Sequence, residues 1–148
     1  MTGLTDSRST LFGPVELNMI TLPGAEPSAA LLEAIAVQVR AGVLRILDFV
    51  VIHKGDDGEI EVTEVDFEAP AGGEVELELV LPGLTGDEDL QLLAEDLAPG
   101  SSAAVAAFEL LFAREFTAQL AADGCAVVTT ERIPAPVVNA LVEMADEA

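Results

Sequence analysis

The stretch VLRILDFVVIH, residues 43–53, decides how this chain folds. It is rich in branched and aromatic side chains, which is typical of a β-strand, and its apolar residues point to both faces of a sheet. A sheet that is exposed to water on one side does not need such a strand. We therefore expect the second face to be covered, either by a C-terminal helix of the same chain or by another copy of the protein.

The segments on either side of this strand complete a β-α-β unit. Residues 14–22 alternate apolar and polar side chains, as a half-buried strand does. Between Ser28, a good N-cap residue, and Gly42, apolar side chains recur at three- and four-residue steps and predict a helix. Asp57-Gly58 then predicts a tight turn into a further strand over residues 60–65.

The same order of elements recurs in the last third of the chain. A strand of small apolar residues is predicted over 102–108, a helix over 110–122 and another strand over 125–132. Two β-α-β units predict an α+β, ferredoxin-like fold, in which an antiparallel sheet carries two helices on one face. A last, C-terminal helix is predicted over 134–147.

The rest of the chain is assigned around these two halves. Residues 1–12 are polar and predict a flexible N-terminal tail, and residues 13–148 predict a single domain. An insertion over about 59–98 holds the hairpin strand and a helix that Asp87 is expected to cap. Within this insertion, residues 74–79 alternate like a short strand.

Acidic residues dominate the charge of the protein. Asp and Glu number 27 and Lys and Arg number 6, which gives a net charge of −21 at pH 7. This charge repels phosphate backbones and anionic lipid headgroups, so neither nucleic acid nor a membrane is an expected partner. Acids crowd residues 56–89, which are expected to form an anionic surface. That surface either docks a basic protein partner, or collects divalent cations, or only confers solubility or salt adaptation.

Several features of the sequence point to a cytoplasmic protein. The single cysteine, Cys125, cannot form an internal disulfide, and the first ten residues are polar rather than a signal peptide. Glu109 and Arg114 interrupt the longest apolar stretch, which stays short of the roughly 20 residues that a membrane helix needs.

Several short segments carry a resemblance to a known family. They are Gly13-Pro14-Val15-Glu16, Ile46-Leu47-Asp48, Pro99-Gly100-Ser101-Ser102-Ala103 and Arg132-Ile133-Pro134. With them, residues 13–142 resemble an actinobacterial family of unknown function. The step at Pro99 is also similar to the soluble part of bacterial proteins that contain a glycine zipper, a segment that this chain lacks. The resemblance therefore implies the fold, but no reaction and no membrane role.

Few residues are candidates for chemistry. His53 is the only histidine and is expected to be an ordinary residue at a strand end, and Cys125 is expected to be a small core residue. The acids around Asp57 are explained by the turn, and Gly100 is explained by a helix stop rather than by a phosphate loop. Arg45 and Asp48 fall on opposite faces of their strand by simple alternation. We expect no catalytic residue, no cofactor and no metal site.

The leading hypothesis is a non-catalytic interaction or regulatory module that forms a homo-oligomer. Its candidate interface lies on the strand predicted over residues 43–53, at Leu44, Ile46, Phe49 and Val51. Two arginines that stand among acids, Arg114 and Arg132, are candidate contacts for an anion. The alternative is a small-ligand or divalent-cation sensor, or an enzyme whose site the sequence does not reveal.

Overall fold

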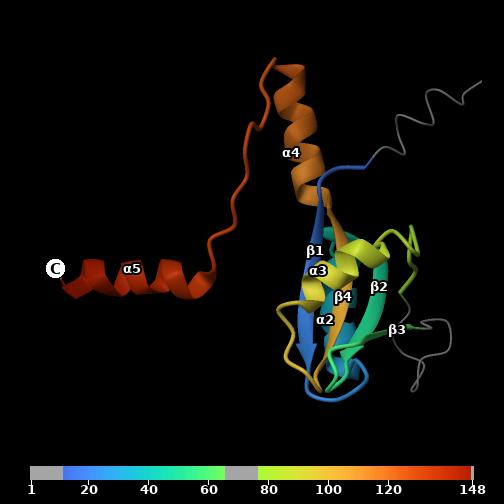
Figure 1. Ribbon diagram of the computed structural model, residues 1–148. Helices are drawn as coiled ribbons and strands as arrows, with labels where there is room; N and C mark the ends of the chain where they lie inside the picture. Colours follow the sequence, from blue (N-terminus) through green and yellow to red (C-terminus); the bar gives the residue numbers. More distant parts are fainter. Residues whose placement is uncertain (1–11, 66–76, 148) are drawn as a thin grey trace, which may run out of the picture. The chain divides into compact units, whose positions relative to one another are not determined.

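The computed structural model of the protein describes residues 12–65 and 77–147 (Figure 1). The predicted tail, apart from its last residue, and half of the predicted strand over 74–79 lie outside the described residues. Contacts within the chain divide it into two compact units, Met1–Phe116 and Thr117–Ala148. Each unit is described by itself.

The helices and strands follow the predicted order closely. They are β1 (Val15–Leu22), α2 (Ala29–Arg40), β2 (Leu44–Lys54), β3 (Ile60–Glu64), α3 (Asp87–Ala94), β4 (Ser102–Leu110), α4 (Leu111–Ala122) and α5 (Ala135–Glu147). The α+β class is therefore confirmed. None of the helices among the described residues is both long enough and apolar enough to cross a membrane.

The local signals that begin and end these elements are largely confirmed. The Ser28 hydroxyl accepts a hydrogen bond from the backbone N–H of Leu31 at 3.1 Å and so caps α2. Gly58 has a φ of +86° and closes the turn between β2 and β3, where its N–H donates to the carbonyl of Gly55 at 3.0 Å. The predicted N-cap of α3 is wrong by one residue, because Gly86 is the N-cap and Asp87 is the first helical residue. In that position the negative charge of Asp87 interacts favourably with the helix dipole.

The four strands form one antiparallel sheet in the order β1-β4-β2-β3. Although α2 joins β1 to β2 in the chain, these two strands do not pair, because β4 lies between them. β1 and β3 are the two edges of this sheet. Figure 1 shows the blue β1 beside the orange β4, which in turn lies next to the green β2.

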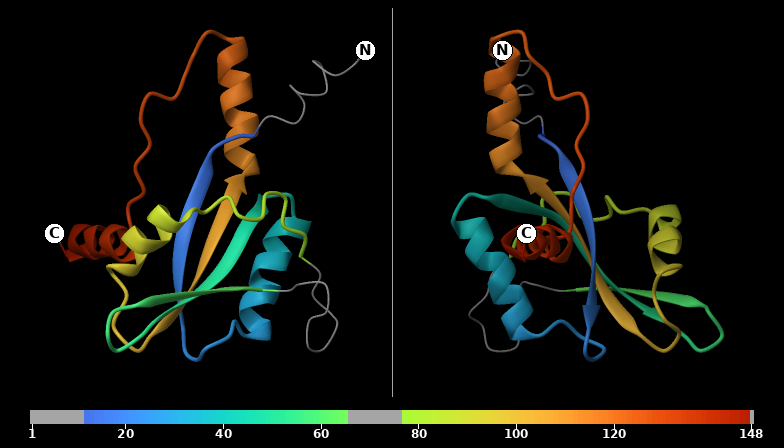
Figure 2. Two further views of the ribbon diagram at one scale, coloured as in Figure 1. Left: turned by 45° about the vertical axis from the view of Figure 1, so that its right-hand side comes forward. Right: turned by 90° about the vertical axis from the view of Figure 1, so that its left-hand side faces the viewer.

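Of the helices, α2 lies on one face of the sheet and α3 on the other (Figure 2). α2 packs over the α2-side core, whose buried members are Ile35, Ala36, Ile46, Phe49, Val51, Leu77, Ala104, Ala106 and Phe108. α3 packs over the α3-side core, formed by Val50, Ile52, Leu90, Ala94, Leu97, Ala103 and Val105. The second face is therefore covered by the inserted helix α3, and not by the C-terminal helix or second copy that the sequence predicted, while α4, the other helix predicted on the first face, has no buried residue.

The central strand β4 explains how both helices come close to the sheet. Five successive residues, Ala103 to Ala107, are 0% exposed, and four of them are alanine. Such short side chains fill little space on either face, so the larger side chains of β2 and of the helices occupy the two cores. The predicted strand with apolar side chains on both faces, β2, is accordingly buried from Ile46 to Ile52.

The strand predicted over 125–132 is not formed. These residues have neither strand nor helix structure, and every described residue from 121 to 147 is exposed. A strand is stable only where its backbone N–H and C=O groups find a partner. In the described part of the chain no strand pairs with these residues, which is the physical reason that the prediction fails here.

Candidate functional site

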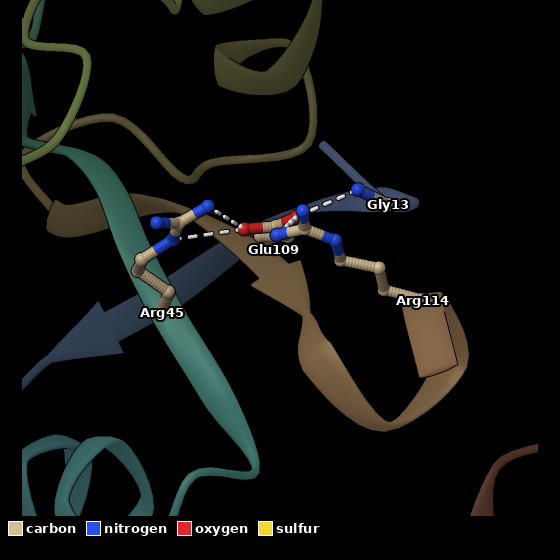
Figure 3. Close-up of polar contacts among 4 residues, drawn as sticks. All are labelled: Gly13, Arg45, Glu109 and Arg114. Carbon is tan, nitrogen blue, oxygen red and sulfur yellow. Dashed lines mark hydrogen bonds and ion pairs between the residues drawn. The ribbon is translucent and has the colours of Figure 1, made fainter. Parts of the chain in front are cut away.

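The most distinctive polar group in the structure is a fully buried carboxylate, that of Glu109, near the end of β4. Its Oε1 accepts hydrogen bonds from Nε and Nη2 of Arg45 at 2.9 and 2.5 Å. Its Oε2 accepts one from the backbone N–H of Gly13 at 2.6 Å and lies 3.7 Å from Nη1 of Arg114. Figure 3 shows the two arginines approaching the carboxylate from opposite sides. We call these four residues the Glu109 cluster.

Strand register and chain connectivity bring the Glu109 cluster together. Arg45 on β2 and Val15 on β1 are both paired with Glu109 in the sheet, and Gly13 lies just before β1. α4 begins at the residue that follows β4, so Arg114 lies within its first turns. The guanidinium of Arg45 also lies over the ring of Phe12, 5.0 Å from its centroid. One carboxylate thus ties together the ends of β1, β2 and β4 and the start of α4.

The charges of the cluster do not balance. Two of the chain's six basic residues face one carboxylate. A buried carboxylate is stable only when it is paired and hydrogen-bonded, which explains why Glu109 has three donors. The arginine side chains keep 35% and 33% of their surface exposed, so their charge remains accessible to water. The role of Arg114 as an anion contact stays a prediction.

The Glu109 cluster leaves no room for a side chain at Gly13. A Cβ atom at this position would lie 2.4 Å from Cβ of Arg114. We therefore expect Gly13→Ala to lower the free energy of unfolding by about 1–3 kcal/mol, because α4 or β1 must shift. Gly24→Ala is the control, since nothing lies within 4 Å of its added Cβ. Urea denaturation checks the prediction, which is wrong if both variants unfold at the same urea concentration.

A second buried carboxylate, that of Asp48, holds the loop before α3. Its oxygens accept hydrogen bonds from the backbone N–H groups of Gly83 at 3.1 Å and Thr85 at 2.9 Å, and from its own neighbour Phe49 at 3.0 Å. The Thr85 hydroxyl is buried and has no hydrogen-bond partner among the described atoms. Asp48 is therefore a structural acceptor that closes the loop over the α3 face of β2.

The predicted placement of Arg45 and Asp48 on opposite faces is wrong. A bulge interrupts the register of β2 with β4 between Ile46 and Asp48. Arg45 pairs with Glu109 and Asp48 pairs with Ala107, which is two residues away on the same strand. Both side chains therefore lie on the face that carries α3, because residues two apart on a strand share a face. The extra residue of a bulge reverses the alternation on which the prediction relied.

The four predicted interface residues all belong to the α2 side of the sheet. Ile46, Phe49 and Val51 are 1%, 1% and 6% exposed and form part of the α2-side core, against which Leu44 packs while partly buried. Their role as an interface stays a prediction, and it requires α2 to move away from Ile46, Phe49 and Val51. Arg132, the other predicted anion contact, is exposed in the unit Thr117–Ala148.

The histidine and the cysteine that were considered as reactive or metal-binding residues lie at the surface of the structure. His53 is exposed and its Nδ1 lies 2.9 Å from the hydroxyl of Ser102 across the β2–β4 pair. Cys125 was expected to be buried, but it is exposed. In the ranges 12–65 and 77–147, no three His, Cys, Asp or Glu side chains gather in a way that could hold a metal ion.

Fold and site together define the class: an α+β protein with a four-stranded antiparallel sheet, one helix on each face and a buried carboxylate that joins three strands to a helix. The model of the family of unknown function DUF6325 matches residues 11–146, and the chain belongs to this family. No curated protein and no solved structure matches the chain. Membership of a family of unknown function assigns no reaction to the Glu109 cluster.

Proposed function

We propose that this protein is a non-catalytic interaction module that associates with a second copy of itself. The observation that carries the proposal is the exposure of the C-terminal residues, where Val128, Leu141 and Met144 are 91%, 61% and 65% exposed. α5 has no buried residue, although it carries an apolar stripe at Val137, Val138, Leu141 and Met144. A short helix gains its stability mainly by burying such a stripe, so these residues are expected to meet a partner surface.

The sheet supports the same proposal through its edge. Its two faces are occupied by α2 and α3, which leaves the outer side of β1 without a paired strand in the described structure. Each copy of the chain therefore brings both a C-terminal unit with exposed apolar side chains and an open strand edge. Two copies that exchange these surfaces form a closed, symmetric pair, which is the commonest form of oligomer.

The large negative charge predicts how this association responds to salt. Each copy carries a net charge of −21, so two copies repel one another until salt screens the repulsion. A complex between the acidic surface and a basic protein has opposite charges, and salt weakens it. The direction of the salt effect therefore separates the self-association proposed here from the docking of a basic partner.

Sedimentation equilibrium of the full chain at about 0.05 and 0.5 M NaCl tests the proposal. We expect a reversible dimer whose dissociation constant falls by at least about tenfold at the higher salt concentration. A protein that remains monomeric at both salt concentrations, up to the highest soluble protein concentration, would contradict the proposal. A dimer that dissociates as salt rises would show that opposite charges, rather than apolar surfaces, hold the copies together.

A further inference from the structure

We infer that residues 125–132 of one copy form a β-strand on the outer edge of β1 of the second copy. The inference rests on the proposed self-association and names the surfaces that meet. The sheet of each copy then gains a fifth strand next to β1, in the position that the second β-α-β half of a ferredoxin-like fold requires. The pairing is antiparallel, as all three strand pairs in this sheet are.

The outer edge of β1 lacks the features that usually prevent an edge strand from pairing with a further strand. β1 is eight residues long, contains no proline and no basic residue, and carries a single charge at Glu16. Soluble proteins usually protect an edge strand by making it short, by charging it, or by interrupting it with proline or a bulge. The opposite edge follows this rule, because β3 is only five residues long and two of them are glutamates. β1 is therefore the edge that a further strand completes.

The segment 125–132, with the sequence CAVVTTER, matches this edge in length and chemistry. It has eight residues, as β1 does, and four successive ones are the β-branched residues Val127 to Thr130. Its one acid and its one base cancel, which makes it a neutral segment of a chain with a net charge of −21. In the antiparallel orientation the end that carries both Glu131 and Arg132 lies beside the end of β1 that carries Glu16, so the segment brings no net charge to that end.

The connection between β4 and α4 favours a second copy over the same chain. A strand that returns to β1 of its own chain needs a helix that reverses direction after β4 and packs on the sheet. α4 begins at the residue directly after β4, without a connecting turn, and contributes no buried residue. The Glu109 cluster fixes this direct connection, because Arg114 in α4 and Gly13 before β1 both contact the Glu109 carboxylate. If two copies exchange their C-terminal units, the helix that follows β4 does not have to reverse the direction of the chain.

Site-specific cross-linking tests the inference in the full chain. Antiparallel pairing places Cys125 beside the C-terminal end of β1, where Thr21 is exposed. The native chain, whose one cysteine is Cys125, is mixed with the double variant Cys125→Ser/Thr21→Cys and treated with a short bis-maleimide. The control replaces Thr21→Cys by Glu61→Cys, at an exposed position on β3, the other edge. We expect cross-links between residues 125 and 21 to form at least about tenfold faster than those to the control position.

Each outcome of this experiment decides the question. Equal cross-linking at both edges, in a protein that sedimentation shows to be dimeric, overturns the inference and leaves the proposed self-association standing. The variant that carries both Cys125 and Thr21→Cys gives a further reading: a link within one chain means that the segment covers its own β1, which also overturns the inference. A monomer without either link contradicts both the inference and the proposed function.

Discussion

Replacement of Phe49 by alanine is expected to lower the free energy of unfolding by about 3–5 kcal/mol. The Phe49 ring is 1% exposed and lies in the α2-side core, between the central strands and α2. Its removal loses the free energy of burying a large aromatic side chain and leaves a cavity that the surrounding strands cannot fill. Urea denaturation followed by circular dichroism, at a protein concentration low enough to keep the chain monomeric, measures the effect.

Leu92→Ala is the matched control for this substitution. Leu92 is a large apolar residue in α3, but it is 63% exposed, so its truncation is expected to change the free energy of unfolding by less than about 0.5 kcal/mol. The sequence predicted Phe49 as an interface residue. If that prediction is right, Phe49→Ala leaves the stability of the monomer unchanged and weakens only the dimer, an outcome that would contradict the role of Phe49 in the core.

Glu109→Gln is expected to be the second severe substitution, with a loss of about 2–3 kcal/mol. The amide keeps the shape of the carboxylate but removes its charge. The backbone N–H of Gly13 then donates to a weaker acceptor or faces an amide N–H, and Arg45 and Arg114 face each other without an anion. Both arginines keep about a third of their surface in contact with water, which limits the loss below that of a fully buried ion pair.

Glu33→Gln is the control for the loss of a single glutamate charge. Glu33 pairs with Arg40 at 2.7 Å, but both side chains are about half exposed, at 48% and 60%. Exposed ion pairs contribute little, so this variant is expected to lie within about 0.5 kcal/mol of the native chain. Thermal and urea denaturation of both variants make the comparison. Equal stability of Glu109→Gln and Glu33→Gln would mean that the Glu109 cluster does not hold the strand ends together.

Local patterns in the sequence were sufficient to predict most elements of this fold. The alternation over 14–22, the three- and four-residue steps after Ser28 and the Asp57-Gly58 turn each depend on neighbouring residues only, and each is confirmed. The apolar character of both faces of β2 also correctly indicated a sheet covered on both sides. What covers the second face was predicted wrongly as a C-terminal helix or another copy, since the packing of α3 there depends on contacts between residues far apart in the chain.

The Glu109 cluster was missed for a similar reason. In the sequence, Glu109 is a single acid that interrupts the apolar run from Ala103 to Ala113, and it was interpreted only as an obstacle to a membrane helix. The signal that points to it is its place at the end of a small-residue strand in the centre of a sheet, where a charge needs a partner. Finding that partner, Arg45, requires the register between β2 and β4, which the bulge before Asp48 makes impossible to deduce by alternation.

The strand over 125–132 failed as a prediction because a strand is not a local property. Its β-branched residues favour extended backbone, but the hydrogen bonds that stabilise a strand come from a neighbour. The pattern over residues 125–132 therefore indicates that this segment is able to pair with a strand, and not that it forms one by itself.

The position of β4 between β1 and β2 has a consequence for the synthesis of this protein. Until Leu110 has left the ribosome, the β2–β3 hairpin is the strand pair of the described sheet that is able to form. The residues from Lys54 to Leu110 take roughly 3–11 s to translate at about 5–20 residues per second. During that interval the apolar side chains of β1 and β2 stay without the strand that joins them, and nascent chains on neighbouring ribosomes are close enough to aggregate. The order of the strands thus lengthens the time for which the apolar strands β1 and β2 of a new chain stay unpaired, and the strong negative charge of the protein helps to keep such chains apart.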